Sequence, residues 1–183
     1  MIKFCVFVDP RVCDFADLLA GYASDAQVVV LDLLQDGVMQ IAEALTGQSG
    51  IDAIHIVSHG AVGSLSLGGS VLNSITLPQY SGALATIGAA LNSDGDILLY
   101  GCDVAQGAAG QRFIQQLAAY TQADVVASIP ALRRALSPTL TTPLRGLSSS
   151  AARLLRDKLS PPATPWLTRM VWARSATNGV LQA

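Results

Sequence analysis

The sequence predicts an α/β protein: a three-layer αβα sandwich in which helices cover both faces of a mainly parallel sheet. Two observations support this fold class. Short apolar runs alternate with segments of helical character along residues 1–128. These runs are apolar almost throughout, without the polar-apolar alternation of a strand that has one solvated face. Parallel strands are buried on both faces, so the pattern favours a parallel sheet.

The elements are expected in a regular order along the chain. The predicted strands are the runs at residues 2–8, 28–31, 54–58, 96–100 and 125–127. The predicted helices are the segments 14–21, 37–45, 81–91 and 110–120, from helical spacing, glycine stops or alanine and leucine content. We expect Asp36 to cap the second helix and residues 92–95 to form the turn that ends the third. The Gly68-Gly69 pair is expected to turn a small hairpin.

Composition divides the chain into two parts. Residues 1–128 contain 12 of the 13 acidic residues but three of the 11 basic ones, a net charge of −9. Residues 129–183 contain eight basic residues and one acidic residue, a net charge of +7, among prolines and serines. We therefore expect an α/β domain over residues 1–128 and an irregular basic tail over 129–183. Nucleic-acid binding is not expected, because the arginines are scattered among prolines and the aromatic residues do not interleave with them in a stacking pattern.

Several classes of protein are disfavoured by what the sequence lacks. No apolar run reaches the roughly 18 residues of a membrane span, and the first residues do not resemble a signal peptide. Three cysteines without CxxC spacing and two histidines predict neither a disulfide framework nor a metal site. No phosphate-binding glycine loop of the GxGxxG or GxxxxGK type occurs, so no cofactor is expected.

Two predicted strands are followed by residues with catalytic chemistry. His59 and Gly60 follow the strand at residues 54–58, and Cys102 follows the strand at residues 96–100 after one glycine. In parallel sheets, sites form beyond the carboxyl ends of the strands, so both side chains are expected at one edge. An adjacent imidazole can activate a thiol for attack on a carbonyl carbon. The amides of Gly60 and Cys102 are the expected donors to the resulting oxyanion.

Three further residues are candidates for a substrate-binding or supporting role. Asp9 and Arg11 lie just past the first predicted strand, and Arg11 is either an exposed loop residue or a ligand for a substrate carboxylate. Asp103 is expected in a turn ahead of a helix, with a role as a third catalytic acid left open. His55 lies four residues before His59, but a zinc pair at that spacing needs a helix, so His55 is expected to be structural.

The order of these motifs resembles that of the caspase-like cysteine peptidases, which include gingipains, separases and CHAT-type proteases. In that group an apolar strand ending in His-Gly precedes one ending in the nucleophilic cysteine. Here His59 and Cys102 are 43 residues apart, near the roughly 50 of caspases. An α/β-hydrolase site is disfavoured because no histidine follows Cys102.

The sequence resembles one bacterial family within that fold more closely. It is a family of domains of unknown function that is common near the N-terminus of giant repeat-rich adhesin and surface proteins. The matching stretches cover residues 1 to about 128: Val6–Asp9, Asp52–Ala61, Gly63–Gly68, Leu98–Ala105 and Gly107. The resemblance implies a peptide or protein substrate and export by a route without a signal peptide; otherwise the location is cytoplasmic.

Beyond Ser128 the sequence departs from that family, in which a glycine-rich strand finishes the domain. One hypothesis is a C-terminal end altered by a shifted reading frame. Two functions remain open at this point. The first is a cysteine peptidase that uses His59 and Cys102 through an acyl-thioester, and the second is a non-catalytic interaction or structural module of a bacterial surface protein. The oligomeric state is not predicted.

Overall fold

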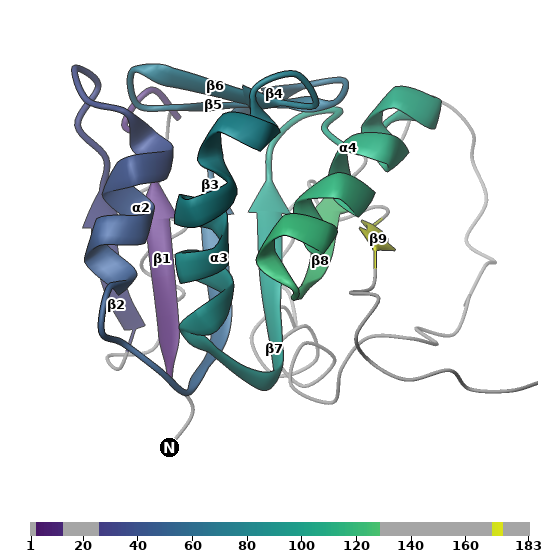
Figure 1. Cartoon of the computed structure of the whole chain (residues 1–183). Helices are drawn as coiled ribbons and strands as arrows, with labels where there is room; N and C mark the ends of the chain where they lie inside the picture. Colours follow the sequence, from purple (N-terminus) through teal and green to yellow (C-terminus); the bar gives the residue numbers. More distant parts are fainter. Residues whose placement is uncertain (1–2, 13–25, 129–169, 174–183) are drawn as a thin grey trace, which may run out of the picture.

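The computed structural model of the protein describes residues 3–12, 26–128 and 170–173 (Figure 1). The strands are β1 (Phe4–Val8), β2 (Ala26–Val30), β3 (Ile51–Val57), β4 (His59–Ala61), β5 (Ser64–Leu67), β6 (Ser70–Asn73), β7 (Leu91–Tyr100), β8 (Asp124–Ser128) and β9 (Met170–Ala173). The helices are α2 (Gly37–Leu45), α3 (Ser81–Ala89) and α4 (Gly107–Thr121), with a 3-10 turn η1 (Leu77–Tyr80) before α3.

The main sheet has the strand order β2-β1-β3-β7-β8-β9. The first five strands of this order run parallel, and β9 pairs antiparallel with β8. Strand β1 thus lies between β2 and β3, so the chain first moves to one side of β1 and then to the other. Ligand sites of open α/β sheets form where the strand order reverses in this way, outside the carboxyl ends of the strands.

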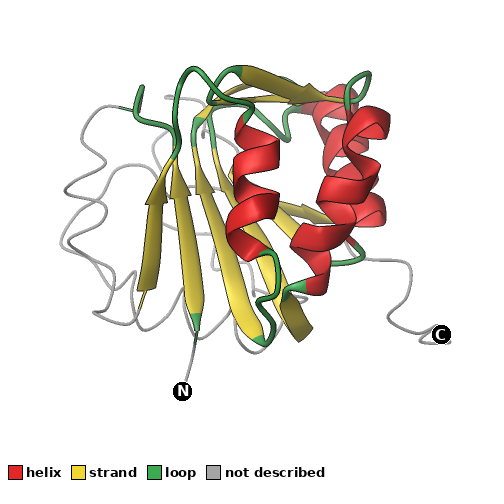
Figure 2. Cartoon of the chain, turned by 60° about the vertical axis from the view of Figure 1, so that its left-hand side comes forward, coloured by secondary structure: helices red, strands yellow, loops and turns green. Residues whose placement is uncertain are grey.

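Both faces of the main sheet are buried. The described helices α2, α3 and α4 lie together on one face, as Figure 2 shows, and cover residues such as Phe7, Ile54 and Leu99. Phe4 and Leu98 are also buried, on the other face. A mainly parallel sheet with flanking helices and two buried faces confirms the predicted α/β class and fits a three-layer sandwich.

The second sheet lies over the carboxyl ends of the parallel strands. It consists of β4, β5 and β6 in antiparallel order, and Figure 1 shows it crossing the top of the main sheet. The predicted hairpin around Gly68-Gly69 is confirmed as β5 and β6. Strand β4 was not predicted; it places His59 opposite Ser66. The edge where the candidate residues gather therefore has a second layer of structure above it.

Local sequence explains the helices. The carboxylate of Asp36 accepts hydrogen bonds from the amides of Val38 (2.9 Å) and Met39 (3.1 Å), which confirms the predicted cap of α2. Helix α4 ends at Thr121, and the following residue, Gln122, adopts a left-handed conformation with φ of 56°. None of the helices within the described ranges is long and apolar enough to cross a bilayer.

The structure corrects the predicted end of the third helix. Residues 92–95 do not form a turn after α3; they belong to the start of β7. The register with β3 shifts there, because Ile51 pairs with Leu91 while Ala53 pairs with Asp96. Four residues of β7 (92–95) thus lie opposite the single residue Asp52 of β3, an irregularity that sequence patterns do not reveal without the partner strand. The predicted helix at 14–21 lies outside the described residues, as does the tail except for β9.

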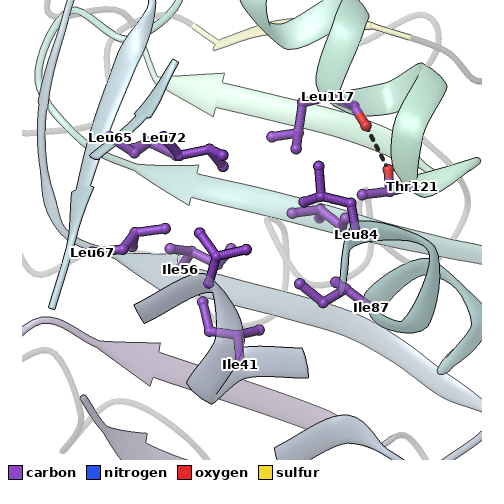
Figure 3. Close-up of a pocket in the computed structure, with 11 residues that line it drawn as sticks. Ile41, Ile56, Leu65, Leu67, Leu72, Leu84, Ile87, Leu117 and Thr121 are labelled. Carbon is purple, nitrogen blue, oxygen red and sulfur yellow. Dashed lines mark hydrogen bonds between the residues drawn. The ribbon is translucent and has the colours of Figure 1, made fainter. Parts of the chain in front are cut away.

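A small apolar space lies in the core between the main sheet, the helices and the hairpin (Figure 3). Its volume is about 10 Å³, the size of a single water molecule. The side chains around it are Val38, Ile41, Ile56, Leu65, Leu67, Leu72, Leu84, Ile87, Ile97, Leu117 and Thr121. The Thr121 hydroxyl donates to the carbonyl of Leu117 (2.9 Å). The space is far smaller than the 300–1,000 Å³ of typical ligand pockets, so it is packing space within the core.

The close contact between α3 and α4 gives a test of this packing. A Cβ at Gly88 of α3 would overlap the backbone carbonyl of Thr121, whereas a Cβ at Gly82 of the same helix would meet nothing within 4 Å. We expect Gly88→Ala to lower the free energy of unfolding by about 1–3 kcal/mol. We expect the control Gly82→Ala to stay within about 1 kcal/mol of the wild type. Urea unfolding of both variants checks this, and equal stabilities would contradict the packing.

Candidate functional site

His59 is positioned by the end of β3 and the start of β4. Strand β3 ends at Val57, and the amide of Ser58 donates to the carbonyl of Tyr100 on β7 (3.1 Å). The chain then turns into β4, where the side chain of His59 is exposed to solvent. The parallel pairing of β3 with β7 thus continues one residue past β3 and ends directly before the histidine.

Cys102 follows β7, the direct neighbour of β3. Gly101 between the strand and the cysteine is buried, and a Cβ there would lie 2.9 Å from Cγ2 of Val104 and 3.3 Å from the carbonyl oxygen of Ser58. A side chain at position 101 would therefore push the loop away from β3. The Cys102 thiol is free and exposed.

The backbones of the two motifs touch at Gly60. A Cβ at this position would overlap Cγ2 of Val104 and would lie 2.9 Å from the carbonyl oxygen and 3.3 Å from the amide nitrogen of Cys102. Glycine is the residue without a Cβ, so it permits this approach. The structure therefore brings the His59-Gly60 segment against the Cys102 backbone, as expected from the strand order.

Asp103 has an unusual backbone conformation directly after the cysteine. Its φ is 59°, in the left-handed region, and its carbonyl accepts a hydrogen bond from the amide of Gln106 (2.9 Å). Aspartate is one of the few residues other than glycine that tolerates this region. Asp103 thus forms the turn that leads into α4, in agreement with the expectation for it.

The ring of His59 is held by a backbone carbonyl. Its Nε2 lies 2.9 Å from the carbonyl oxygen of Arg11. A carbonyl oxygen only accepts hydrogen bonds, so Nε2 carries a proton, and in the neutral ring Nδ1 has the free lone pair. Between the two described residues His59 and Cys102 no side-chain hydrogen bond is formed. Such catalytic contacts often tighten only when substrate is bound.

Asp9 and Arg11 are bound to each other rather than separately exposed. The guanidinium of Arg11 donates to both oxygens of Asp9, from Nε (2.8 Å) and from Nη2 (2.6 Å). Nη2 also donates to the carbonyl of Gly68 (2.9 Å), and the amide of Gly68 donates to Asp9 (2.9 Å). The charge of Arg11 is thus paired with Asp9, which favours a supporting role over binding of a substrate carboxylate.

The carboxylate of Asp9 has no exposed surface, whereas 42% of the Arg11 side chain is exposed. Burial by itself would raise the pKa of Asp9, but its hydrogen bonds from Arg11 and Gly68 outweigh burial and lower the pKa below its usual value. Asp9 is therefore a buried anion that holds the end of β1 and the turn at Gly68 together.

His55 is a structural histidine on the other face of the sheet. It is 2% exposed, its Nδ1 lies 3.0 Å from the hydroxyl of Tyr100, and its ring stacks on that tyrosine. Burial lowers the pKa of His55 from 6.5 to about 4. Cys5 is also buried, and burial raises the pKa of its thiol. The burial of His55 matches the structural role expected for it.

The sequence identified the residues at this edge but missed their connections. It indicated neither the Arg11 carbonyl as partner of His59 nor the role of the Gly68 turn. The Asp9-Pro10 pair at the end of the first strand favours a turn, and this turn is the only local signal for the connection. Among the described residues no cluster of histidine, cysteine and acidic side chains has the arrangement of a metal site.

Comparison with known proteins identifies a family but no activity. A family model described as "Domain of unknown function (DUF4347)" matches residues 5–132. A search of curated proteins finds no match. Among solved structures, a small-chain dehydrogenase is similar at 13% sequence identity and a TM-score of 0.32, over 67% of this chain and 71% of that one.

The buried His55 predicts a loss of stability in acid. Between pH 6.5 and about 4 the unfolded chain binds a proton at this residue that the folded chain does not, so stability falls as the pH falls through this range. We expect the free energy of unfolding to drop by about 2 kcal/mol more in the wild type than in His55→Gln between pH 7.5 and 5. Urea titrations at both pH values check this. An unchanged drop in His55→Gln would contradict the assignment.

The approach of Gly60 to the Cys102 loop gives a second prediction. We expect Gly60→Ala to lower the free energy of unfolding by about 1–3 kcal/mol, because its methyl group overlaps Val104 and crowds Cys102. Val104→Ala removes the Cγ2 atom, so the cost of Gly60→Ala should be at least about 0.5 kcal/mol smaller in that background. A double-mutant cycle measures this coupling. Additive effects would show that the two segments do not touch.

Proposed function

The chain belongs to the DUF4347 family of domains of unknown function, and we propose that it is a caspase-like cysteine-peptidase-like domain. In this proposal His59 and Cys102 hydrolyse a peptide bond through an acyl-thioester. The main support is that β3 and β7 end side by side, with the His59-Gly60 backbone against that of Cys102 and both side chains exposed. The resemblance of both motifs to those of caspase-like peptidases also supports it.

The hydrogen bond at Nε2 supports a specific role for His59 in this proposal. Because that nitrogen donates to Arg11, Nδ1 is the nitrogen that accepts the proton of the Cys102 thiol. The thiolate then attacks the carbonyl carbon of the substrate and forms a C–S bond. His59 returns the proton to the leaving amine as the C–N bond breaks. Water, deprotonated by His59, cleaves the thioester, releases the carboxylate product and restores the thiol.

The tetrahedral intermediate requires donors for its oxyanion. The backbone amides of Gly60 and Cys102 are the proposed donors, and the close approach of the two backbones supports this, since a Cβ on Gly60 would lie 3.3 Å from the amide nitrogen of Cys102. The left-handed backbone of Asp103 supports the same location, because unusual conformations cluster at functional sites. Asp9 and Arg11 act in this proposal as support for His59, and the substrate is a peptide or protein segment.

The alternative is a non-catalytic interaction or structural module of a large bacterial surface or adhesin protein. One observation favours it: among the described residues, no hydrogen bond joins the thiol of Cys102 to the ring of His59. In this alternative the two motifs maintain the packing of the strand ends, and Cys102 behaves as an ordinary exposed thiol. The two proposals share the fold and differ in the reactivity that they predict for the sulfur atom of Cys102.

Thiol reactivity separates the two functions. We expect iodoacetamide to alkylate Cys102 rapidly at pH 7, and His59→Ala to slow this reaction by about 10-fold or more, as general-base assistance is lost. Peptide mapping by mass spectrometry measures each cysteine separately. Cys5 is buried with a raised pKa and provides a slow internal reference. His55→Gln is the matched control, because His55 lies on the other face.

Peptide acyloxymethyl ketones and a peptide library complete the test. If the domain is a peptidase, we expect the ketone to label Cys102 and the protein to cleave library peptides. Both activities should be lost in Cys102→Ala. Equal alkylation of Cys102 in the wild type and in folded His59→Ala, without cleavage of any peptide, would refute the peptidase and support the non-catalytic module.

A further inference from the structure

We infer that the Asp9–Arg11 pair positions His59: it fixes the carbonyl that selects the Nε2–H form of the imidazole. The catalytic consequence of this inference rests on the proposed function, but the positioning itself does not. The inference makes Asp9 and Arg11 positioning residues that act through His59, without contact to substrate.

The local sequence creates a free carbonyl at Arg11. Residues Asp9 to Val12 form a turn closed by a hydrogen bond from the amide of Val12 to the carbonyl of Asp9 (3.1 Å). Pro10 suits the second position of such a turn, and the Asp9 side chain accepts the amide of Arg11 (3.0 Å). The turn thus uses the carbonyl of Asp9 for its own closure. The carbonyl of Arg11 meets His59 instead.

The side chains then lock this turn in place. Arg11 binds Asp9 through two nitrogen atoms, and such forked contacts fix orientation as well as distance. The same guanidinium reaches the carbonyl of Gly68, and the amide of Gly68 returns to Asp9. With its backbone and side chain both bound, Arg11 has little freedom to move its carbonyl away from His59.

The same carboxylate also determines where the backbone of His59 lies. His59 belongs to β4, which pairs with β5, and Gly68 is the residue directly after β5. Asp9 binds the amide of Gly68 and the guanidinium of Arg11 at once. The backbone of His59 is therefore held through β5, and its ring is held through Arg11. Both connections lead to one buried anion at the end of β1.

The consequence concerns the two nitrogen atoms of an exposed ring. A solvent-exposed imidazole without a fixed partner can rotate and can carry its proton on either nitrogen. The Arg11 carbonyl removes this freedom, because only the Nε2–H form donates to it. Nδ1 is then constantly available as the basic atom. The hydrogen bond to the Arg11 carbonyl would raise the reaction rate by pre-organising the His59 ring. A small displacement of a reacting group can lower a rate by about 100-fold.

Nitrogen NMR of the histidines tests the inference directly. The chain has two histidines, so a protein labelled with 15N-histidine gives two sets of ring signals. At pH 8 we expect His59 of the wild type to show one form, with the proton on Nε2. In Asp9→Asn and Arg11→Ala we expect the His59 signals to shift toward a mixture of both forms, while the signals of His55 stay unchanged. Alkylation of Cys102 should slow by between about 10- and 100-fold in both variants.

Matched substitutions separate positioning from a general loss of structure. Asp32→Asn alters another aspartate beyond a strand end, with hydrogen bonds to Leu34 and Gln35 and none to Arg11 or Gly68. Arg112→Ala alters an exposed arginine on α4. Both controls should leave the His59 form and the alkylation rate unchanged. Arg11→Lys keeps the charge without the fork and should fall between Arg11→Ala and the wild type.

Each outcome has a defined meaning. Circular dichroism establishes that each variant folds, and Arg11→Ala carries the test if Asp9→Asn does not fold, because the Arg11 side chain is partly exposed. An unchanged Nε2–H signal in folded Arg11→Ala would overturn the inference and leave the proposed peptidase intact. A shifted signal, with alkylation in the wild type that is independent of His59, would support the positioning and refute the peptidase.

Discussion

The candidate site depends on the buried carboxylate of Asp9. A carboxylate without solvent contact is stable as an anion only if hydrogen bonds and a countercharge replace the lost water. Arg11 and Gly68 provide both, and they come from the turn after β1 and from the turn between β5 and β6. One anion therefore joins the main sheet to the second sheet above it. The position of His59 follows from that junction.

Close backbone approach is the second constraint at this edge. The Cys102 loop passes so near Gly60 that no Cβ fits between them, and Gly101 meets a similar restriction beside Ser58. These glycines serve the geometry of two strand ends that must remain adjacent. A strand pair with larger residues there would separate, and the thiol and the imidazole would move apart. The same residues are thus needed for packing and for the proposed chemistry.

The two histidines show how environment divides roles among identical side chains. His55 is enclosed beside Tyr100, and burial lowers its pKa to about 4, so the ring is neutral at physiological pH. His59, four residues later, is exposed beyond the same strand and is held through one nitrogen. The end of β3 separates the two residues. His55 lies within the strand and packs in the core, whereas His59 lies after the strand and its ring is accessible to solvent and to a substrate. This division agrees with the proposed function and with the structural assignment of His55.

The sequence by itself determined the alternation of strands and helices, the Asp36 cap, the hairpin at Gly68 and the placement of His59 and Cys102 at neighbouring strand ends. These features follow from local patterns of apolar residues, caps and glycines, which act over a few residues. The tertiary structure alone decided the irregular pairing of β7 with β3, strand β4 and the pairing of β9 with β8, since each depends on a partner distant in the chain. It also decided that the guanidinium of Arg11 pairs with Asp9 while its backbone carbonyl accepts the hydrogen bond of His59. A backbone carbonyl is present at every residue, so only the fold can select the one that holds the histidine.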